Sequence, residues 1–210
     1  MELYLYGDVV DDKDTWYPED YITPLGVKAK LDAIDPYEDI TMYINSGGGD
    51  VFAGNSIHNM LKRHQGQITA CVDGLCASIM SVIALAGNHL VIPSNAYFMI
   101  HKAWTIAIGN SEDMLKTAGV LETIDNGIMN VYKGRLAEGV EEETIKKMVQ
   151  AETWMTGDQV GQYFTNVENT NQQVVYAKTK MQYKNKPKVL ESCEVGKDKA
   201  LFFRLRFGGI

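Results

Sequence analysis

The chain has 210 residues, which is enough for one domain with a full hydrophobic core. Hydrophobic residues make up 45% of the chain and charged residues 22%, values close to the globular average that exclude disorder along its whole length. The formal net charge of −7 argues against a general nucleic-acid-binding protein.

Strand–turn–helix units recur along the chain. Apolar alternation predicts strands, and apolar residues three and four positions apart predict helices. The expected strands are residues 3–6, 40–44, 68–72, 90–92 and 97–100, with a loop over 11–23 and a turn at Asp73-Gly74. The expected helices are residues 25–33, 51–63, 76–86, 112–136, 141–149 and 157–163. This order favours an α/β fold with largely parallel strands.

The end of the chain differs in charge from the rest. Between Lys178 and Arg206 there are nine Lys or Arg residues and three acidic residues, whereas the remainder of the chain is acidic. We expect one domain over residues 1–177 and a basic tail, partly extended or disordered, over residues 178–210.

The cysteines and the apolar runs indicate a compartment. Cys71, Cys76 and Cys193 form an odd set without metal-ligand spacing, which is typical of a reducing environment. The N-terminus has no signal-peptide pattern, and the longest apolar run, residues 79–86, is too short to cross a membrane. We therefore expect a cytoplasmic protein with neither a membrane nor a nucleic-acid partner.

Three glycines, Gly47, Gly48 and Gly49, stand between an expected strand and an expected helix. Their backbone N–H groups form either a plain turn or an anion-binding site, such as an oxyanion hole for acyl transfer. The run lacks the Lys-Ser/Thr of a P-loop and the third glycine of a dinucleotide fingerprint, so no nucleotide cofactor is expected. The chain also lacks His-Glu-x-x-His and Cys/His clusters, so no metal site is expected.

Three further segments carry residue types suited to catalysis. Ser78 follows small residues at the expected start of a helix, where free backbone N–H groups favour developing negative charge. His101 ends an apolar strand, and Glu152 precedes Trp154 where a carboxylate could orient an imidazole. Each segment alone is also compatible with a purely structural role. His58 and His64 lie on a polar helix and are expected at the surface.

Together these segments resemble the proteolytic subunit of the Clp protease family over roughly residues 2–165. The matching segments are Ile44-Asn45-Ser46-Gly47-Gly48-Gly49, Gly74-Leu75-Cys76-Ala77-Ser78 and Met99-Ile100-His101. Gly47 stands where that family often has Pro, and Cys76 where it often has Ala. The resemblance implies the α/β fold shared by this family and the crotonases, a spiral of strand–strand–helix units with a protruding handle helix at residues 112–136.

The resemblance also implies roles for individual residues. Ser78 would be the nucleophile of a serine endopeptidase and His101 its base, with the backbone N–H groups of Gly49 and Ile79 as the oxyanion hole. Glu152 stands where the family has Asp and would orient His101, and Asp158 is the alternative acid. We further expect an extended polypeptide substrate to add as a strand, along Gly48 and Val51 on one side and along Ile106, Ala107 and Ile108 on the other.

The resemblance implies a homo-oligomeric ring, with seven subunits or a double ring of seven as the family default. Thr23-Pro24, Lys62-Arg63-His64 and Glu152-Thr153-Trp154 resemble the phage and prophage branch, which implies head maturation with capsid or scaffold proteins as partners. Three alternatives remain: an ATPase-partnered degradative subunit, a crotonase-like acyl-CoA enzyme, and a catalytically silent assembly protein.

Overall fold

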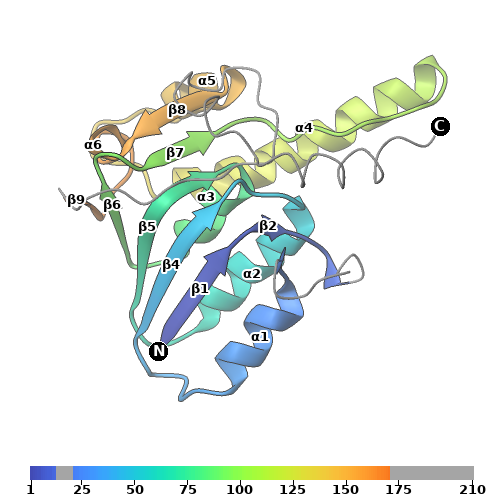
Figure 1. Cartoon of the computed structure of the whole chain (residues 1–210). Coiled ribbons are helices and arrows are strands. Elements are labelled where there is room, and N and C mark those ends of the chain that lie inside the picture. The colour runs from blue at the N-terminus through green and yellow to red at the C-terminus, as the bar shows by residue number, and fades with distance from the viewer. Residues whose placement is uncertain (13–20, 171–210) are drawn as a thin grey trace, which may run out of the picture.

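The computed structural model describes residues 1–12 and 21–170. Within them, a seven-stranded and mostly parallel sheet has the order β1-β4-β5-β6-β9, with β7 joined to β5 and β8 to β7 (Figure 1). The strands are β1 Glu2–Tyr6, β2 Asp8–Val9, β3 Tyr21–Ile22, β4 Ile40–Ser46, β5 Ile68–Ala77, β6 His89–Pro93, β7 Tyr97–Ile100, β8 Thr153–Thr156 and β9 Val167–Thr170. The helices are α1 Pro24–Asp32, α2 Val51–Arg63, α3 Ile79–Ala84, α4 Ser111–Lys133, α5 Glu142–Gln150 and α6 Gly157–Val160. The predicted α/β class is confirmed.

The long strand β5 is where the sheet divides. Its first part, Thr69–Cys71, pairs with β6, and its last part, Leu75–Ala77, pairs with β7. On its other edge it pairs with β4, where Ile44 lies opposite Val72 but Ser46 lies opposite Cys76. β5 therefore holds two extra residues in a bulge, which bends the strand beside the point where it ends.

This bulge corrects two predictions. The expected turn at Asp73-Gly74 is wrong, because these residues lie inside β5 and the bulge absorbs them. The expected helix at 76–86 begins only at Ile79, because Cys76 and Ala77 pair with Phe98 and Met99 of β7.

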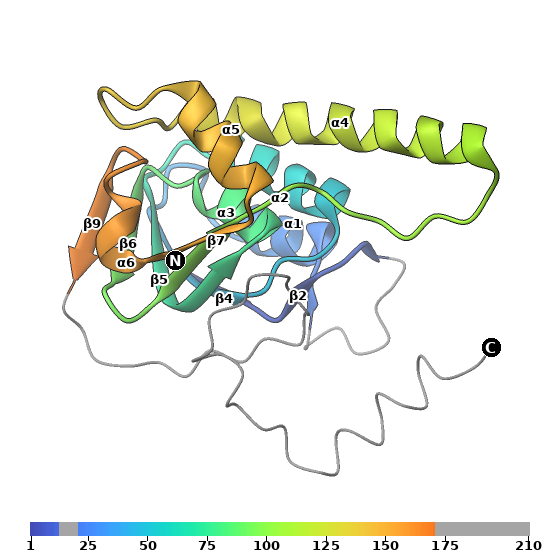
Figure 2. The same ribbon diagram turned by 90° about the horizontal axis from the view of Figure 1, so that it is seen from above.

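Helices α1, α2 and α3 cover one face of β1, β4 and β5 (Figures 1 and 2). Alternate residues of β4, such as Met42 and Ile44, are fully buried beneath them. The side chain of His58 on α2 is also buried, and its Nδ1–H donates to the Val82 carbonyl of α3 at 2.8 Å. The predicted surface position of His58 is therefore wrong.

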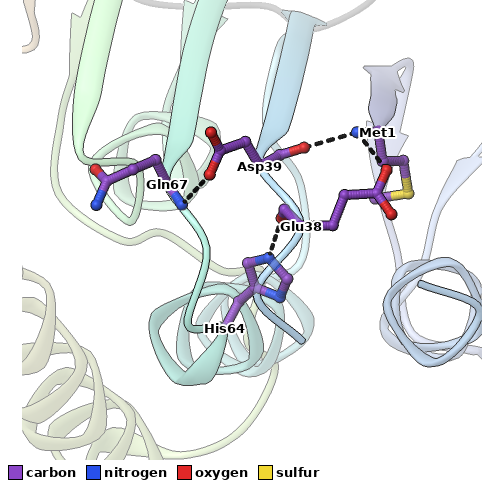
Figure 3. Close-up of polar contacts among 5 residues, drawn as sticks. All are labelled: Met1, Glu38, Asp39, His64 and Gln67. Atoms are coloured by element: carbon purple, nitrogen blue, oxygen red, sulfur yellow. Dashed lines mark hydrogen bonds and ion pairs between the residues drawn. The ribbon is translucent and has the colours of Figure 1, made fainter. Parts of the chain in front are cut away.

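The amino ends of β1, β4 and β5 are joined by polar contacts (Figure 3). The Met1 amino group donates to the Asp39 carbonyl at 2.6 Å and pairs with Glu38 at 2.9 Å. The Gln67 N–H donates to Asp39 Oδ1 at 2.9 Å. A ring nitrogen of His64 lies 2.7 Å from the Glu38 carbonyl oxygen. These contacts fix one end of the parallel strands, so the carboxyl ends of the same strands face the opposite end of the sheet.

The long helix α4 projects from the body of the molecule (Figures 1 and 2). Its buried residues all lie in its second half: Asp125, Ile128, Met129 and Tyr132. Residues 101–110 run from β7 out to its projecting end, where Asn110 caps the first turn. In the described part of the chain, no helix has the length and hydropathy needed to span a membrane. The predicted basic tail and the domain boundary at residue 177 lie outside the described residues.

Candidate active site

Ser78 sits in the sharp turn between β5 and α3. Its backbone has φ 57° and ψ −132°, a conformation that costs a non-glycine residue about 1–3 kcal/mol and that surrounding contacts must hold. The Ser78 N–H donates to the Met99 carbonyl at 3.0 Å, and its own carbonyl accepts from the Ser81 N–H at 3.0 Å and the Ser81 hydroxyl at 2.6 Å. The turn therefore presents the Ser78 side chain at the carboxyl end of the sheet.

His101 follows β7, the strand that pairs with the last residues of β5. Ala77 lies opposite Met99 in this parallel pair, so the two strands end side by side. The His101 Nε2 lies 2.7 Å from the Ser78 Oγ. The structure thus brings together the two residues that the sequence proposed as nucleophile and base, although they are 23 positions apart.

Glu152 reaches the same place from β8. Ile100 of β7 pairs with Thr153 of β8 in antiparallel register, so the residue after Ile100 meets the residue before Thr153. Those residues are His101 and Glu152, and Glu152 has a positive φ of 52° at this point. The sequence predicted no strand over residues 153–156, which in the structure pair with β7.

Burial and two carboxylates act on His101 in opposite directions. Burial lowers the pKa of His101 below its ordinary value, while the negative charges of Glu152 and Asp125 raise it. Asp158 is not among the charged groups that shift this pKa, and it lies exposed in the first turn of α6. The geometry thus favours Glu152 over Asp158 as the carboxylate beside the imidazole.

Asp125 was missed by sequence reasoning. It lies on the buried side of α4, where its Oδ1 accepts from the Ala103 N–H at 2.8 Å and its Oδ2 lies 3.2 Å from the Lys102 Nζ. The signal was present as an acidic residue on the apolar face that carries Ile124, Ile128 and Tyr132. Asp125 therefore holds Lys102 and Ala103, the two residues that directly follow His101, against α4.

The glycine run lies against the turn that holds Ser78. A Cβ built on Gly48, whose φ is +92°, would come within 2.7 Å of both the Ala77 carbonyl oxygen and the Ser78 Cβ, and 3.2 Å from the Ile79 nitrogen. Only glycine fits so close to this turn.

The orientation of Gly49 follows from its bridge to Val9. In this parallel bridge, Val9 bonds to the Gly48 carbonyl at 2.9 Å and to the Asp50 N–H at 2.8 Å. The N–H of Gly49 itself therefore points away from Val9, toward the side of β4 on which β5 lies. Within the described residues, neither the Gly49 N–H nor the Ile79 N–H has a hydrogen-bond partner.

The segments expected to bind substrate flank this site. Val51 begins α2 directly after the glycine run and is partly buried. On the other side, residues 103–108 form no strand, and Ile106 and Ile108 are 83% and 98% exposed. The isolated chain therefore forms no strand over Ile106, Ala107 and Ile108, where the sequence predicted an edge for a substrate strand to pair with.

The arrangement can carry out acyl transfer. A hydroxyl hydrogen-bonded to an imidazole, a carboxylate beside that imidazole, and unpaired backbone N–H groups next to the hydroxyl are the parts that nucleophilic hydrolysis requires. Within residues 1–12 and 21–170, no three His, Cys, Asp or Glu side chains gather closely enough to hold a metal ion.

Comparisons with known proteins agree with this chemistry. Residues 27–164 match the family model described as Clp protease. Three similar curated proteins are each named ATP-dependent Clp protease proteolytic subunit. That of Leuconostoc citreum is 32% identical over 137 residues, that of Ligilactobacillus salivarius 34% over 145 residues, and that of Bacteroides fragilis 27% over 136 residues. Each match covers 63% of this chain, and it spans 68%, 68% and 64% of the respective relative.

Proposed function

Because the chain belongs to the Clp protease family, we propose that it is a serine endopeptidase with Ser78 as nucleophile and His101 as base. The observation that carries the proposal is the 2.7 Å contact between Ser78 Oγ and His101 Nε2 at the carboxyl end of the sheet. The lowered pKa of His101 supports it too, because a base must be neutral at working pH.

The proposed reaction has two halves. His101 takes the proton of Ser78 as Oγ attacks the peptide carbonyl, and the imidazolium then gives that proton to the leaving amine. Water deprotonated by His101 hydrolyses the resulting ester and restores Ser78. The Glu152 carboxylate orients the imidazole and stabilises its charged form. The backbone N–H groups of Gly49 and Ile79 stabilise the oxyanion.

Substrate binding is proposed to use the backbone. An extended polypeptide would pair with Gly48 and Val51 on one side and with Ile106, Ala107 and Ile108 on the other. Residues 104–108 follow His101 and belong to no strand of the described sheet, which supports this placement. Such binding suits a peptidase that cleaves flexible segments without strong side-chain selection.

Labelling with a fluorophosphonate tests the nucleophile. The protein should acquire one phosphonyl group on Ser78, found by mass spectrometry of the tryptic peptide, and should cleave an unstructured fluorogenic peptide. Ser78→Ala should lose both activities while keeping its circular dichroism spectrum. Full peptide cleavage by Ser78→Ala would contradict the assignment.

The same experiment separates the other classes. A crotonase-like enzyme would act on an acyl-CoA thioester with Ser78 unlabelled, and a silent assembly protein would show neither labelling nor turnover. Neither a crotonase-like enzyme nor a silent assembly protein would need the Ser78 hydroxyl for its function.

A homo-oligomeric ring is proposed as the working form. The projecting half of α4 carries three exposed apolar residues, Met114, Leu115 and Val120. Neighbouring exposed apolar side chains of this kind are typical of a protein–protein contact surface. Seven subunits, in one ring or two, is the family default. Light scattering at micromolar concentration should give a mass of at least seven chains. A monomer would contradict the proposal.

For the biological role, we favour cleavage of capsid or scaffold proteins during phage head maturation. The segments Thr23-Pro24, Lys62-Arg63-His64 and Glu152-Thr153-Trp154 support it by their resemblance to that branch. The relatives named above carry "ATP-dependent" in their names, so an ATPase-partnered degradative role is the second candidate. Portal and capsid genes beside the coding gene, and cleavage of the neighbouring scaffold protein without ATP, should distinguish the first role from the second.

A further inference from the structure

A chain of hydroxyl groups joins α4 to the nucleophile turn. Ser81 lies in the first turn of α3, and its Oγ is 2.6 Å from the Ser78 carbonyl oxygen and 2.7 Å from the hydroxyl of Tyr132 on α4. Both Ser81 and Tyr132 are almost completely buried. The contact therefore links two elements that are 51 positions apart in the sequence, with solvent excluded.

The direction of these hydrogen bonds is fixed by proton count. A carbonyl oxygen only accepts, so the single hydroxyl proton of Ser81 goes to the Ser78 carbonyl. Toward Tyr132, Ser81 can then only accept, so the Tyr132 O–H is the donor. Burial raises the pKa of Tyr132, so its phenol keeps this proton across the pH range in which a histidine base works.

The Ser78 carbonyl belongs to the residue whose backbone is strained. Its φ of 57° and ψ of −132° persist because contacts hold both sides of the peptide. The N–H side is held by Met99, and the carbonyl side by the Ser81 N–H and hydroxyl. Donation from Tyr132 polarises the Ser81 hydroxyl and strengthens its bond to that carbonyl.

We propose that Tyr132 and Ser81 are positioning residues for the nucleophile: through their hydroxyl groups, the buried face of α4 fixes the strained Ser78 backbone and thereby aims Oγ at His101. Neither residue touches the reacting atoms. The inference rests on the proposed peptidase function, since it assigns a rate effect to residues behind its nucleophile.

Tyr132→Phe removes only the phenol hydroxyl and keeps the buried ring. Ser81→Ala removes the hydroxyl that bonds both to Tyr132 and to the Ser78 carbonyl. The first-order rate of fluorophosphonate labelling at Ser78 and the kcat for a fluorogenic peptide should each fall about five- to tenfold in Tyr132→Phe, the factor that corresponds to one buried hydrogen bond. KM should stay unchanged, because the substrate-binding backbone is untouched. Ser81→Ala should fall at least as far, and adding Tyr132→Phe to Ser81→Ala should lower the rate no further.

Two controls separate positioning from a loss of stability. Tyr37→Phe removes an exposed phenol hydroxyl far from the site, and Ile40→Val shortens a core side chain at the amino end of β4. Both should keep the wild-type labelling rate well below the unfolding temperature. If Tyr132→Phe unfolds more easily but labels at the wild-type rate, the inference is wrong while the proposed function stands. If wild-type protein fails to label at Ser78, the proposed function itself fails.

Discussion

His101 and Glu152 occupy facing positions just beyond the last residue pair of β7 and β8. This relationship follows from the antiparallel pairing of Ile100 with Thr153. It brings a carboxylate to the imidazole from a segment 51 positions further along the chain. The positive φ of Glu152 marks the point where the backbone turns from α5 into β8.

Glu152→Gln is expected to lower kcat for peptide cleavage by about 10⁴-fold, because a neutral amide neither stabilises the imidazolium nor holds the required tautomer. Asp158→Asn is the matched control, since its carboxylate is exposed on α6, and it should stay near wild type. Steady-state kinetics with a fluorogenic peptide measures both. The reverse pattern would make Asp158 the orienting acid.

The pH dependence of kcat/KM should report the lowered pKa of His101. The base works in its neutral form, so activity falls as the pH drops through this pKa, and the midpoint should lie below about 6.5. Asp125→Asn and Glu152→Gln each remove a negative charge that favours the imidazolium, so each should move the midpoint to lower pH, and Glu152→Gln should move it further. An upward shift in either variant would show that these carboxylates do not act on the base.

Gly48→Ala should lower the rate of fluorophosphonate labelling by about 100-fold, the scale on which displacements near 1 Å disturb a catalytic geometry. The new methyl group would collide with the Ala77 carbonyl and the Ser78 Cβ, and the φ of +92° disfavours alanine as well. Gly127→Ala on α4 is the control, because its methyl group would meet nothing within 4 Å. Labelling of Gly48→Ala at the rate of Gly127→Ala would mean that the glycine run is an ordinary turn.

Ala107→Pro tests the proposed substrate strand. Proline removes a backbone N–H from an exposed segment outside the described sheet, so folding should be unaffected while KM for a peptide rises. The rate of fluorophosphonate labelling at Ser78 should not change, since the small probe does not need that strand. Unchanged peptide kinetics would place the substrate elsewhere.

The sequence predicted the parts of the site that depend on local pattern. His101 stands at the end of a strand that is recognisable from its own residues, and Ser78 stands at the expected start of a helix. Their pairing as nucleophile and base was predicted from the resemblance of three segments to the Clp protease family, because the extension of β5 to Ala77 was not recognised. The position of β8 could not be predicted, because residues 153–156 become a strand only through pairing with β7, which is distant in sequence. The strand propensity of four residues does not reveal which distant strand they will pair with.

The supporting residues were missed for a related reason. Ser81 reads as one more small residue in an apolar helix, and Tyr132 as one more ring on the buried face of α4. Their role arises from a contact between two helices, which only the packed structure supplies. Asp125 alone left a trace in the sequence, as a charge on an apolar helical face.

The order of the three proposed site residues along the chain has a consequence for biosynthesis. The nucleophile and base lie within one stretch of 24 residues, in neighbouring strands that can pair early, whereas the carboxylate follows only after α4 and α5 have been made. A nascent chain that ends before residue 152 therefore holds Ser78 and His101 without the group that orients them. With Glu152 as the proposed orienting acid, a nascent chain is expected to gain full proteolytic activity only after residue 152 has been synthesised.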